Sequence, residues 1–300
     1  SYALMFIETR KILLKKINEL IKIINKYEKK YSNTAMISRT HGQKASPTTF
    51  GKELKVFTSR VKKQLRFFET REIYGKMNGA VGNYNAHYFV LPQIKWDIET
   101  KKFLNSLGLK QNENPTQIEN HDWIAESLND ISLISNILID FARDIWMYIM
   151  LDYIKQRKIK SEVGSSTMPH KINPINFENA EGNLEIVTSL SQAIGKKLQI
   201  SRFQRDLTDS TVLRNLGVIY SHFYISITSL IKGMNKIDIN IQKINNDLDE
   251  SWEVLAEPIQ TVMRFHNIEN SYDIIKNSTR GKSLNKQTIH SIIKSCDLDD

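Results

Sequence analysis

Residues 163–178 concentrate side chains that can move protons and bind anions. The segment reads VGSSTMPHKINPINFE and contains adjacent serines at positions 165 and 166, followed by Lys171 and Asn173. Loops with this density of different polar groups are often functional, because a plain connector between helices does not need them. The alternative interpretation is a Ser-rich linker that leads into the start of a helix.

A second polar segment, SRFQRDLTDSTVLRN at residues 201–215, is rich in arginine. Arg202, Arg205 and Arg214 flank hydroxyl groups, such as that of Ser210, and acidic side chains. Guanidinium groups bind phosphate or carboxylate with two parallel hydrogen bonds, so the segment is a candidate anion site. A set of salt bridges on a helix surface would have the same composition.

Three shorter segments offer further candidates. His41 lies in the polar stretch SRTHGQ, where it is either a solvated or capping residue or an acid–base group. Gln117, in PTQIE, suits recognition of a base or an amide, but it suits a helix cap equally. The segment GAVGNYNAH, at residues 79–87, lacks the Gly-Lys-Ser/Thr ending of a phosphate-binding loop, so we expect its glycines to permit close backbone approach.

The elements that position these groups are predicted to be helices, because apolar residues recur every three or four places in three stretches. These residues are Leu13, Ile17, Leu20, Ile24 and Tyr27 in the first stretch, Leu128, Ile131, Ile134, Leu138, Phe141, Ile145 and Tyr148 in the second, and Leu216, Tyr220, Phe223, Ile227, Leu230 and Met234 in the third. Such stretches favour a bundle of long helices.

Glycine and proline set the expected helix bounds. Neither occurs between Gln117 and Val163, which predicts a helix of about 35 residues and about 50 Å there. Pro47 suits the first turn of a helix through residues 52–72. We expect no strands of any length. The long helical pattern ends near residue 236, so we predict a central domain at 1–236 and a small C-terminal helical domain at 237–300.

Composition is that of an ordinary globular protein, with 300 residues, 40% of them hydrophobic and 25% charged. The net charge of +9 indicates either a lysine-rich surface or an anionic partner. We find no apolar run long enough to span a membrane and no signal-peptide pattern. The single cysteine, Cys296, fits a reducing compartment, and the seven histidines show no metal-ligand spacing, so no metal is expected.

The stretch GSSTMPHKINP, residues 164–174, resembles the signature loop GSSxMPxKxNP of the fumarase/aspartase superfamily. His170 is similar to the adenylosuccinate lyase version of this loop, whereas fumarases usually carry glycine there and argininosuccinate lyases glutamine. SRTHGQ, GAVGNYNAH, residues 201–215 and WEVLAEPIQTVMR (252–264) also resemble the bacterial type of that family. The resemblance covers nearly the whole chain.

This resemblance implies an all-α fold, in which a fumarase/aspartase-like bundle of long helices carries a small C-terminal helical domain. It also implies a homotetramer with five long helices per subunit and active sites shared by three subunits. The N-terminal domain of the family has no counterpart in the chain, and the C-terminal domain looks incomplete. We therefore expect the chain as it stands to be catalytically incomplete.

The implied activity is that of a carbon–nitrogen lyase of purine biosynthesis. It would release fumarate by β-elimination from adenylosuccinate, giving AMP, and from SAICAR, giving AICAR. By resemblance, Ser165 is the general base, His41 the general acid, and Glu178 the carboxylate that pairs with this histidine. Which of Ser165 and Ser166 removes the proton is left open by the sequence.

The remaining site residues implied by the family bind the substrate. Lys171 and Asn173 would hold the succinyl carboxylates. The residues that would contact the rest of the substrate are Thr40, Gln117, Ser166, Arg205, Ser210 and Arg214. No cofactor, nucleic acid or membrane is expected, and the expected location is the cytoplasm. The alternatives are another lyase of the superfamily, such as argininosuccinate lyase, and a non-catalytic basic scaffold that binds nucleic acid.

Overall fold

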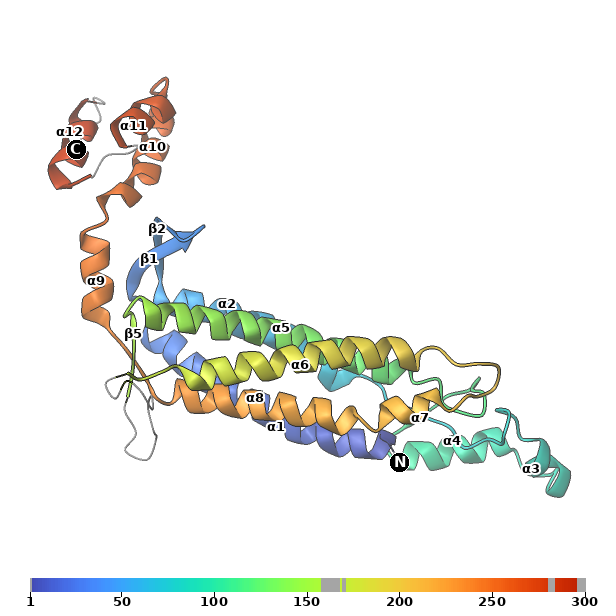
Figure 1. The fold of residues 1–300 in the computed structure, drawn as a ribbon. Coiled ribbons are helices and arrows are strands. Elements are labelled where there is room, and N and C mark those ends of the chain that lie inside the picture. The colour runs from blue at the N-terminus through green and yellow to red at the C-terminus, as the bar shows by residue number, and fades with distance from the viewer. Residues whose placement is uncertain (1, 158–167, 169–170, 280–283, 296–300) are drawn as a thin grey trace. The chain divides into compact units, whose positions relative to one another are not determined.

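The computed structural model of the chain describes residues 2–157, 168, 171–279 and 284–295 (Figure 1). Its elements in chain order are α1 (Tyr2–Lys30), β1 (Ala35–Thr40), β2 (Gln43–Thr49), α2 (Phe50–Thr70), β3 (Tyr74–Gly75), α3 (Asn85–Val90), α4 (Trp96–Ser106), β4 (Lys110–Gln111), α5 (Asp122–Met150), β5 (Ile154–Gln156), α6 (Ile175–Leu198), α7 (Thr208–Leu213), α8 (Leu216–Met234), β6 (Ile237–Ile239), α9 (Ile241–Asp249), the 3-10 helix η1 (Trp252–Leu255), α10 (Ala256–Phe265), α11 (Ser271–Thr279) and α12 (Lys286–Ser295). The predicted helix-rich fold is confirmed.

The chain divides into two compact units, each made of separate stretches of sequence. Unit 1 comprises residues 1–24, 57–147 and 158–237, and unit 2 comprises residues 25–56, 148–157 and 238–300. Because the units interleave along the chain, they do not correspond simply to the two predicted domains. The boundary predicted after residue 236 stays a prediction.

Unit 1 is a bundle of long helices. Among the described residues of the whole chain, five helices have 19 residues or more, namely α1, α2, α5, α6 and α8. The parts of these helices that belong to unit 1 run alongside one another, and α6 packs along the length of α8 (Figure 1). This arrangement agrees with the bundle predicted from the sequence.

Apolar stripes at helical spacing form the core of unit 1. On α8, the six residues predicted to share an apolar face are all buried, and the equivalent stripe on α5 is buried from Leu128 to Ile145. Near one end of the bundle, the ring of Phe6 lies 5.2 Å from that of Trp123 and 5.9 Å from that of Tyr220, measured between centroids. Burial of such side chains contributes about 1.5–3 kcal/mol each to folding.

The helix predicted between Gln117 and Val163 is shorter than expected. Helix α5 has 29 residues, from Asp122 to Met150, rather than about 35. The chain leaves the helix at Asp152, whose φ of 59° lies in the left-handed region, and the following Tyr153 and Ile154 are buried. Asparagine and aspartate tolerate this conformation better than most residues, so the helix ends without glycine or proline.

Unit 2 contains a β-hairpin that the sequence did not predict. Strand β1 pairs with β2 in antiparallel register from Ala35–Thr49 to Thr40–Gln43, with an irregularity after Ile37. Pro47 lies in β2, opposite Ile37, and not in the first turn of a helix as predicted. A proline is tolerated there because a two-stranded sheet has only edge strands.

Helix α2 begins after this hairpin, at Phe50. Thr49 accepts a hydrogen bond of 3.2 Å from the backbone N–H of Lys52, which satisfies one of the free donors at the helix start. The C-terminal helices of unit 2 enclose a separate small core of Met263, Ile275, Leu284, Ile289 and Ile292. In the described part of the chain, no helix combines the length and apolar character needed to cross a bilayer.

Candidate active site

Two predicted site residues, Gln117 and Arg205, meet in unit 1. Nη1 of Arg205 donates a hydrogen bond of 3.4 Å to Oε1 of Gln117. The backbone N–H of Gln117 also donates to the carbonyl oxygen of Gln204, at 3.2 Å. The loop before α5 is therefore tied to the arginine-rich segment by a side-chain contact and a backbone contact.

Lys76, which the sequence did not indicate as a site residue, also binds Gln117. It follows directly on β3, whose Tyr74 and Gly75 pair in parallel with Lys110 and Gln111 of β4. Its ammonium donates to the carbonyl oxygen of Gln117 at 2.6 Å and to that of Gly79 at 3.2 Å. Burial lowers the pKa of Lys76 from its ordinary value, and the charge of Arg205 lowers it further.

The glycine-rich segment after Lys76 permits the close backbone approach that was predicted. Gly82 has a φ of 83°, and a Cβ there would collide with the carbonyl oxygen of Pro115. The backbone N–H of Gly79 donates to the carbonyl oxygen of Asn83 at 2.8 Å, which closes a tight turn. Glycine at position 82 therefore lets this turn pack against the loop that carries Gln117.

Two carboxylates, those of Asp209 and Glu119, lie beside the ring of His121. Oδ2 of Asp209, a residue only 7% exposed, lies 3.5 Å from Nε2 of His121. Oε2 of Glu119 lies 3.7 Å from Nδ1 of the same ring and accepts a 2.9 Å hydrogen bond from the indole of Trp123. The sequence did not indicate His121 as a site residue, because its partner Asp209 lies 88 positions further along the chain.

Ser210 and Arg214 are placed together by a short helix. Ser210 lies in α7 and donates to the carbonyl oxygen of Leu207 at 3.2 Å, and Arg214 follows the end of the same helix. Positions four residues apart share one face of a helix, and Arg214 is exposed. Both residues are therefore available to a ligand near α7, but their predicted role stays a prediction.

The segment before α6 carries the predicted succinyl-binding residues. Lys171 is exposed, and its backbone N–H donates to the carbonyl oxygen of Met168 at 3.0 Å, while Asn173 is half-buried. Glu178 lies in the first turn of α6, where its Oε1 accepts a 3.0 Å hydrogen bond from the indole of Trp146. Ser165 and Ser166 lie outside the described residues.

The predicted general acid lies at the tip of the hairpin of unit 2. His41 is exposed, has a φ of 53°, and occupies the turn between β1 and β2, directly after Thr40. Arg39 steadies the turn by donating a 3.3 Å hydrogen bond to the carbonyl oxygen of Gly42. The pairing predicted between His41 and Glu178, which belong to different units, stays a prediction.

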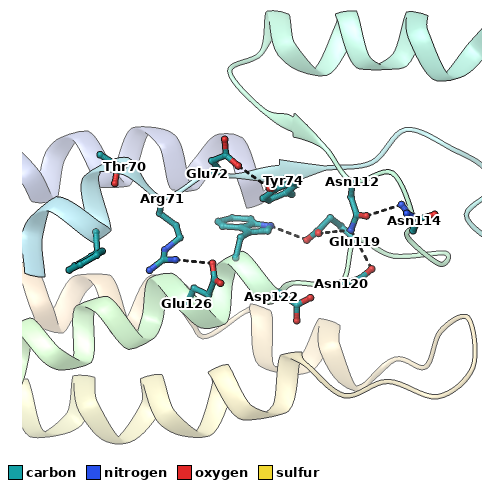
Figure 2. A pocket seen from close by; sticks show the side chains of 12 residues that line it. Thr70, Arg71, Glu72, Tyr74, Asn112, Asn114, Glu119, Asn120, Asp122 and Glu126 are labelled. Atoms are coloured by element: carbon teal, nitrogen blue, oxygen red, sulfur yellow. Dashed lines mark hydrogen bonds and ion pairs between the residues drawn. The ribbon is translucent and has the colours of Figure 1, made fainter.

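A cavity of about 540 Å³ in unit 1 is a different kind of site (Figure 2). Its walls carry the carboxylates of Glu72, Glu119, Asp122 and Glu126, against the single cation of Arg71 among its lining residues. An anionic nucleotide would be repelled by this balance of charge. None of the predicted site residues lines the cavity, so it is not the candidate active site.

Comparison with known families assigns the chain to a class. The profile of the family described as "Lyase" matches residues 1–188, and the one described as "Adenylosuccinate lyase C-terminal" matches residues 201–300. The chain therefore belongs to the lyase family.

Its relatives within this family include adenylosuccinate lyases, which confirms the resemblance drawn from the signature segments. The chain is 47% identical over 299 residues to the adenylosuccinate lyase of Buchnera aphidicola from Acyrthosiphon pisum, and 47% identical over 294 residues to that of Escherichia coli K12. These alignments cover 99% and 98% of the chain, but only 66% and 64% of the relatives. The chain thus spans about two thirds of their length.

Solved structures resemble the chain in fold. A fumarate lyase from Mesorhizobium sp. BNC1 matches with a TM-score of 0.81 at 17% identity, over 98% of the chain and 68% of that protein. A β-carboxy-cis,cis-muconate cycloisomerase from Acinetobacter calcoaceticus sp. ADP1 matches with a TM-score of 0.77 at 16% identity, over 98% and 66%. These likenesses confirm the predicted fold of long helices.

Proposed function

We propose that the full-length protein is an adenylosuccinate lyase, which releases fumarate from adenylosuccinate and from SAICAR, leaving AMP and AICAR. The observation that carries this proposal is the 47% identity to adenylosuccinate lyases over 299 residues. The contact between Gln117 and Arg205 supports it, because it joins an amide suited to a base with a guanidinium suited to a phosphate.

The proposed chemistry needs a base, an acid and fixed cations. Ser165 removes a proton from the carbon next to a succinyl carboxylate, and the electron pair left on that carbon forms the new double bond as the C–N bond breaks. His41 donates a proton to the departing nitrogen. Lys171 and Asn173 stabilise the carboxylate while it carries the extra charge, and oriented groups of this kind typically contribute about 3–4 kcal/mol each.

Assembly into a homotetramer with shared active sites is part of the proposal. Long helices of unit 1 carry apolar side chains that remain 42–57% exposed, among them Ile12, Leu133, Ile186, Val218 and Ile225. Contiguous exposed apolar surface marks interaction sites, and here the proposed occupant is another copy of the chain. Equilibrium sedimentation of the full-length protein should give four times the subunit mass, and a stable monomer would contradict this part of the proposal.

The activity is tested by supplying the purified full-length protein with adenylosuccinate, SAICAR and argininosuccinate in separate assays and measuring the fumarate released. We expect turnover of the first two compounds and none of the third. Turnover of argininosuccinate alone would replace the proposal with the other lyase. Absence of turnover, together with salt-sensitive binding to duplex DNA, would favour the non-catalytic scaffold. The cytoplasm is the proposed location, because purine nucleotide synthesis supplies these substrates there.

A further inference from the structure

Lys76 is the point at which three separate segments of unit 1 meet. Its ammonium donates to the carbonyl oxygens of Gly79 and Gln117, and Gln117 in turn accepts from Arg205. An ammonium has three N–H donors, so these two bonds leave one donor for a further acceptor. Lys76 is half-buried, which makes each of these bonds stronger than it would be in water.

The charge of Lys76 and Arg205 is not balanced by a carboxylate contact in the described part of the chain. The acidic side chains nearest in sequence to Lys76, Gln117 and Arg205 have other partners, and Glu72 accepts from the hydroxyl of Tyr74 at 2.9 Å. Asp206 accepts from the backbone N–H of Thr208 at 2.8 Å, and Glu119 and Asp209 both lie against His121. Two cations held together in this way attract an anion, and a neighbouring positive charge already lowers the pKa of Lys76.

We propose that Lys76 is a positioning residue of the nucleotide site, which fixes the Gln117 loop against Arg205 and adds positive charge where the ligand's phosphate binds. This inference rests on the proposed function and assigns a task to a residue outside the signature segments. Lys76 acts through Gln117 and Arg205, so it is expected to affect affinity far more than the elimination step.

The experiment replaces Lys76 by methionine in the full-length protein, because methionine keeps much of the stem volume and removes the charge. The matched control is Lys101→Met, which removes an exposed lysine of α4 that lies 3.7 Å from Glu113. For each variant, KM and kcat are measured with adenylosuccinate, together with AMP affinity by calorimetry and competitive inhibition by inorganic phosphate.

We expect Lys76→Met to raise KM and to weaken AMP and phosphate binding by about 10- to 100-fold, the range for losing a hydrogen bond to a charged group. The turnover number kcat should stay within about threefold, and Lys101→Met should match the wild type. KM and the dissociation constants refer to folded protein, so partial unfolding alone would leave them unchanged, and kcat is calculated per folded site with the binding stoichiometry that calorimetry gives.

Wild-type affinities for AMP and phosphate in folded Lys76→Met would overturn the inference, as would a loss of kcat with KM unchanged. Failure of the proposed function would look different, since the wild-type protein itself would then turn over neither succinyl substrate. In that case phosphorus NMR titration with inorganic phosphate still tests Lys76, because it needs no turnover. Equal phosphate affinity of the wild type and Lys76→Met would then reject the inference.

Discussion

The indole N–H of Trp146, near the end of α5, donates a 3.0 Å hydrogen bond to the Glu178 carboxylate in the first turn of α6. This bond fixes one oxygen of the carboxylate proposed to pair with His41. Replacing Trp146 by phenylalanine keeps an aromatic ring and removes the donor, so the carboxylate loses its orientation. We expect kcat to fall by about 3- to 30-fold, less than for a half-buried hydrogen bond to a charged group, because Trp146 and Glu178 are both exposed.

The control for this prediction is Trp96→Phe, which removes an indole that donates to the carbonyl oxygen of Leu91 and makes no contact with Glu178. Steady-state kinetics on both variants give the comparison. If Trp146→Phe turned over at the rate of Trp96→Phe, the carboxylate of Glu178 would not depend on Trp146 for its function.

Gly82→Ala should disrupt the turn that packs against the Gln117 loop. The substitution adds a Cβ at a φ of 83° and drives it into the carbonyl oxygen of Pro115. Gly108→Ala is the matched control, since Gly108 has a φ of 75° but its added Cβ would meet nothing closer than 3.9 Å. We expect about 1–2 kcal/mol of destabilisation from the backbone conformation alone in the control, and clearly more in Gly82→Ala.

Urea unfolding measures this difference, and KM for adenylosuccinate provides a second readout. Gly82→Ala should raise KM, because Gln117 follows Pro115 in the displaced loop, whereas Gly108→Ala should leave KM unchanged. Equal unfolding free energies for the two variants would show that the loop moves aside at no cost.

Arg71 should stabilise the folded state, because it neutralises the buried carboxylate of Asp130. Nη2 of Arg71 lies 2.8 Å from the carboxylate of Asp130, whose side chain is 7% exposed. Arg71→Met leaves this carboxylate buried without its cation and should cost about 3–5 kcal/mol in unfolding free energy. Arg60→Met, which removes a pair to the exposed Asp140, should cost about 0–1 kcal/mol. Similar costs for both variants in urea unfolding would contradict this.

Asp130 should also give unfolding an unusual pH dependence. Burial raises the pKa of Asp130 above its ordinary value, although Arg71 opposes the shift. The folded state therefore binds this proton more tightly than the unfolded chain does. The stabilisation that results is complete below the unfolded pKa and is lost as pH rises through the folded pKa.

We therefore expect the unfolding free energy of the wild type minus that of Asp130→Asn to fall as pH rises from about 3 to about 7. Asp206→Asn gives the opposite control, because hydrogen bonds from Thr208 lower the pKa of Asp206. The unfolding free energy of the wild type minus that of Asp206→Asn should therefore grow as pH rises. Urea unfolding at several pH values gives both trends, and a rising difference for Asp130 would reverse the assigned shift.

The long helices were predictable from sequence, because their apolar residues repeat at the helical period over many turns. The hairpin was not, since β1 and β2 are short and β2 is rich in polar residues that show little alternation. Pro47 fits the start of a helix and an edge strand equally well, and only its pairing with Ile37 decides between them. The end of α5 at Met150, just before the left-handed Asp152, carried no glycine or proline signal.

Part of the candidate site was also predictable from the sequence, and part was not. Gln117 and Arg205 were found from their residue types and the family motifs, and the structure brings them into contact. Lys76 was missed because its partner Gln117 lies 41 positions along the chain, so no local spacing reveals the bond. Neighbours of this kind are set by the tertiary fold.

For the shared active sites, we propose that His41 of one subunit and Ser165 of another act on the same succinyl group. It is tested most directly by mixing two inactive full-length variants, His41→Ala and Ser165→Ala, under conditions that allow subunits to exchange. Mixed tetramers would contain some sites with both wild-type residues, so we predict that fumarate release from adenylosuccinate returns, while each variant mixed with itself stays inactive. Mixed tetramers that form and still release no fumarate would contradict the account.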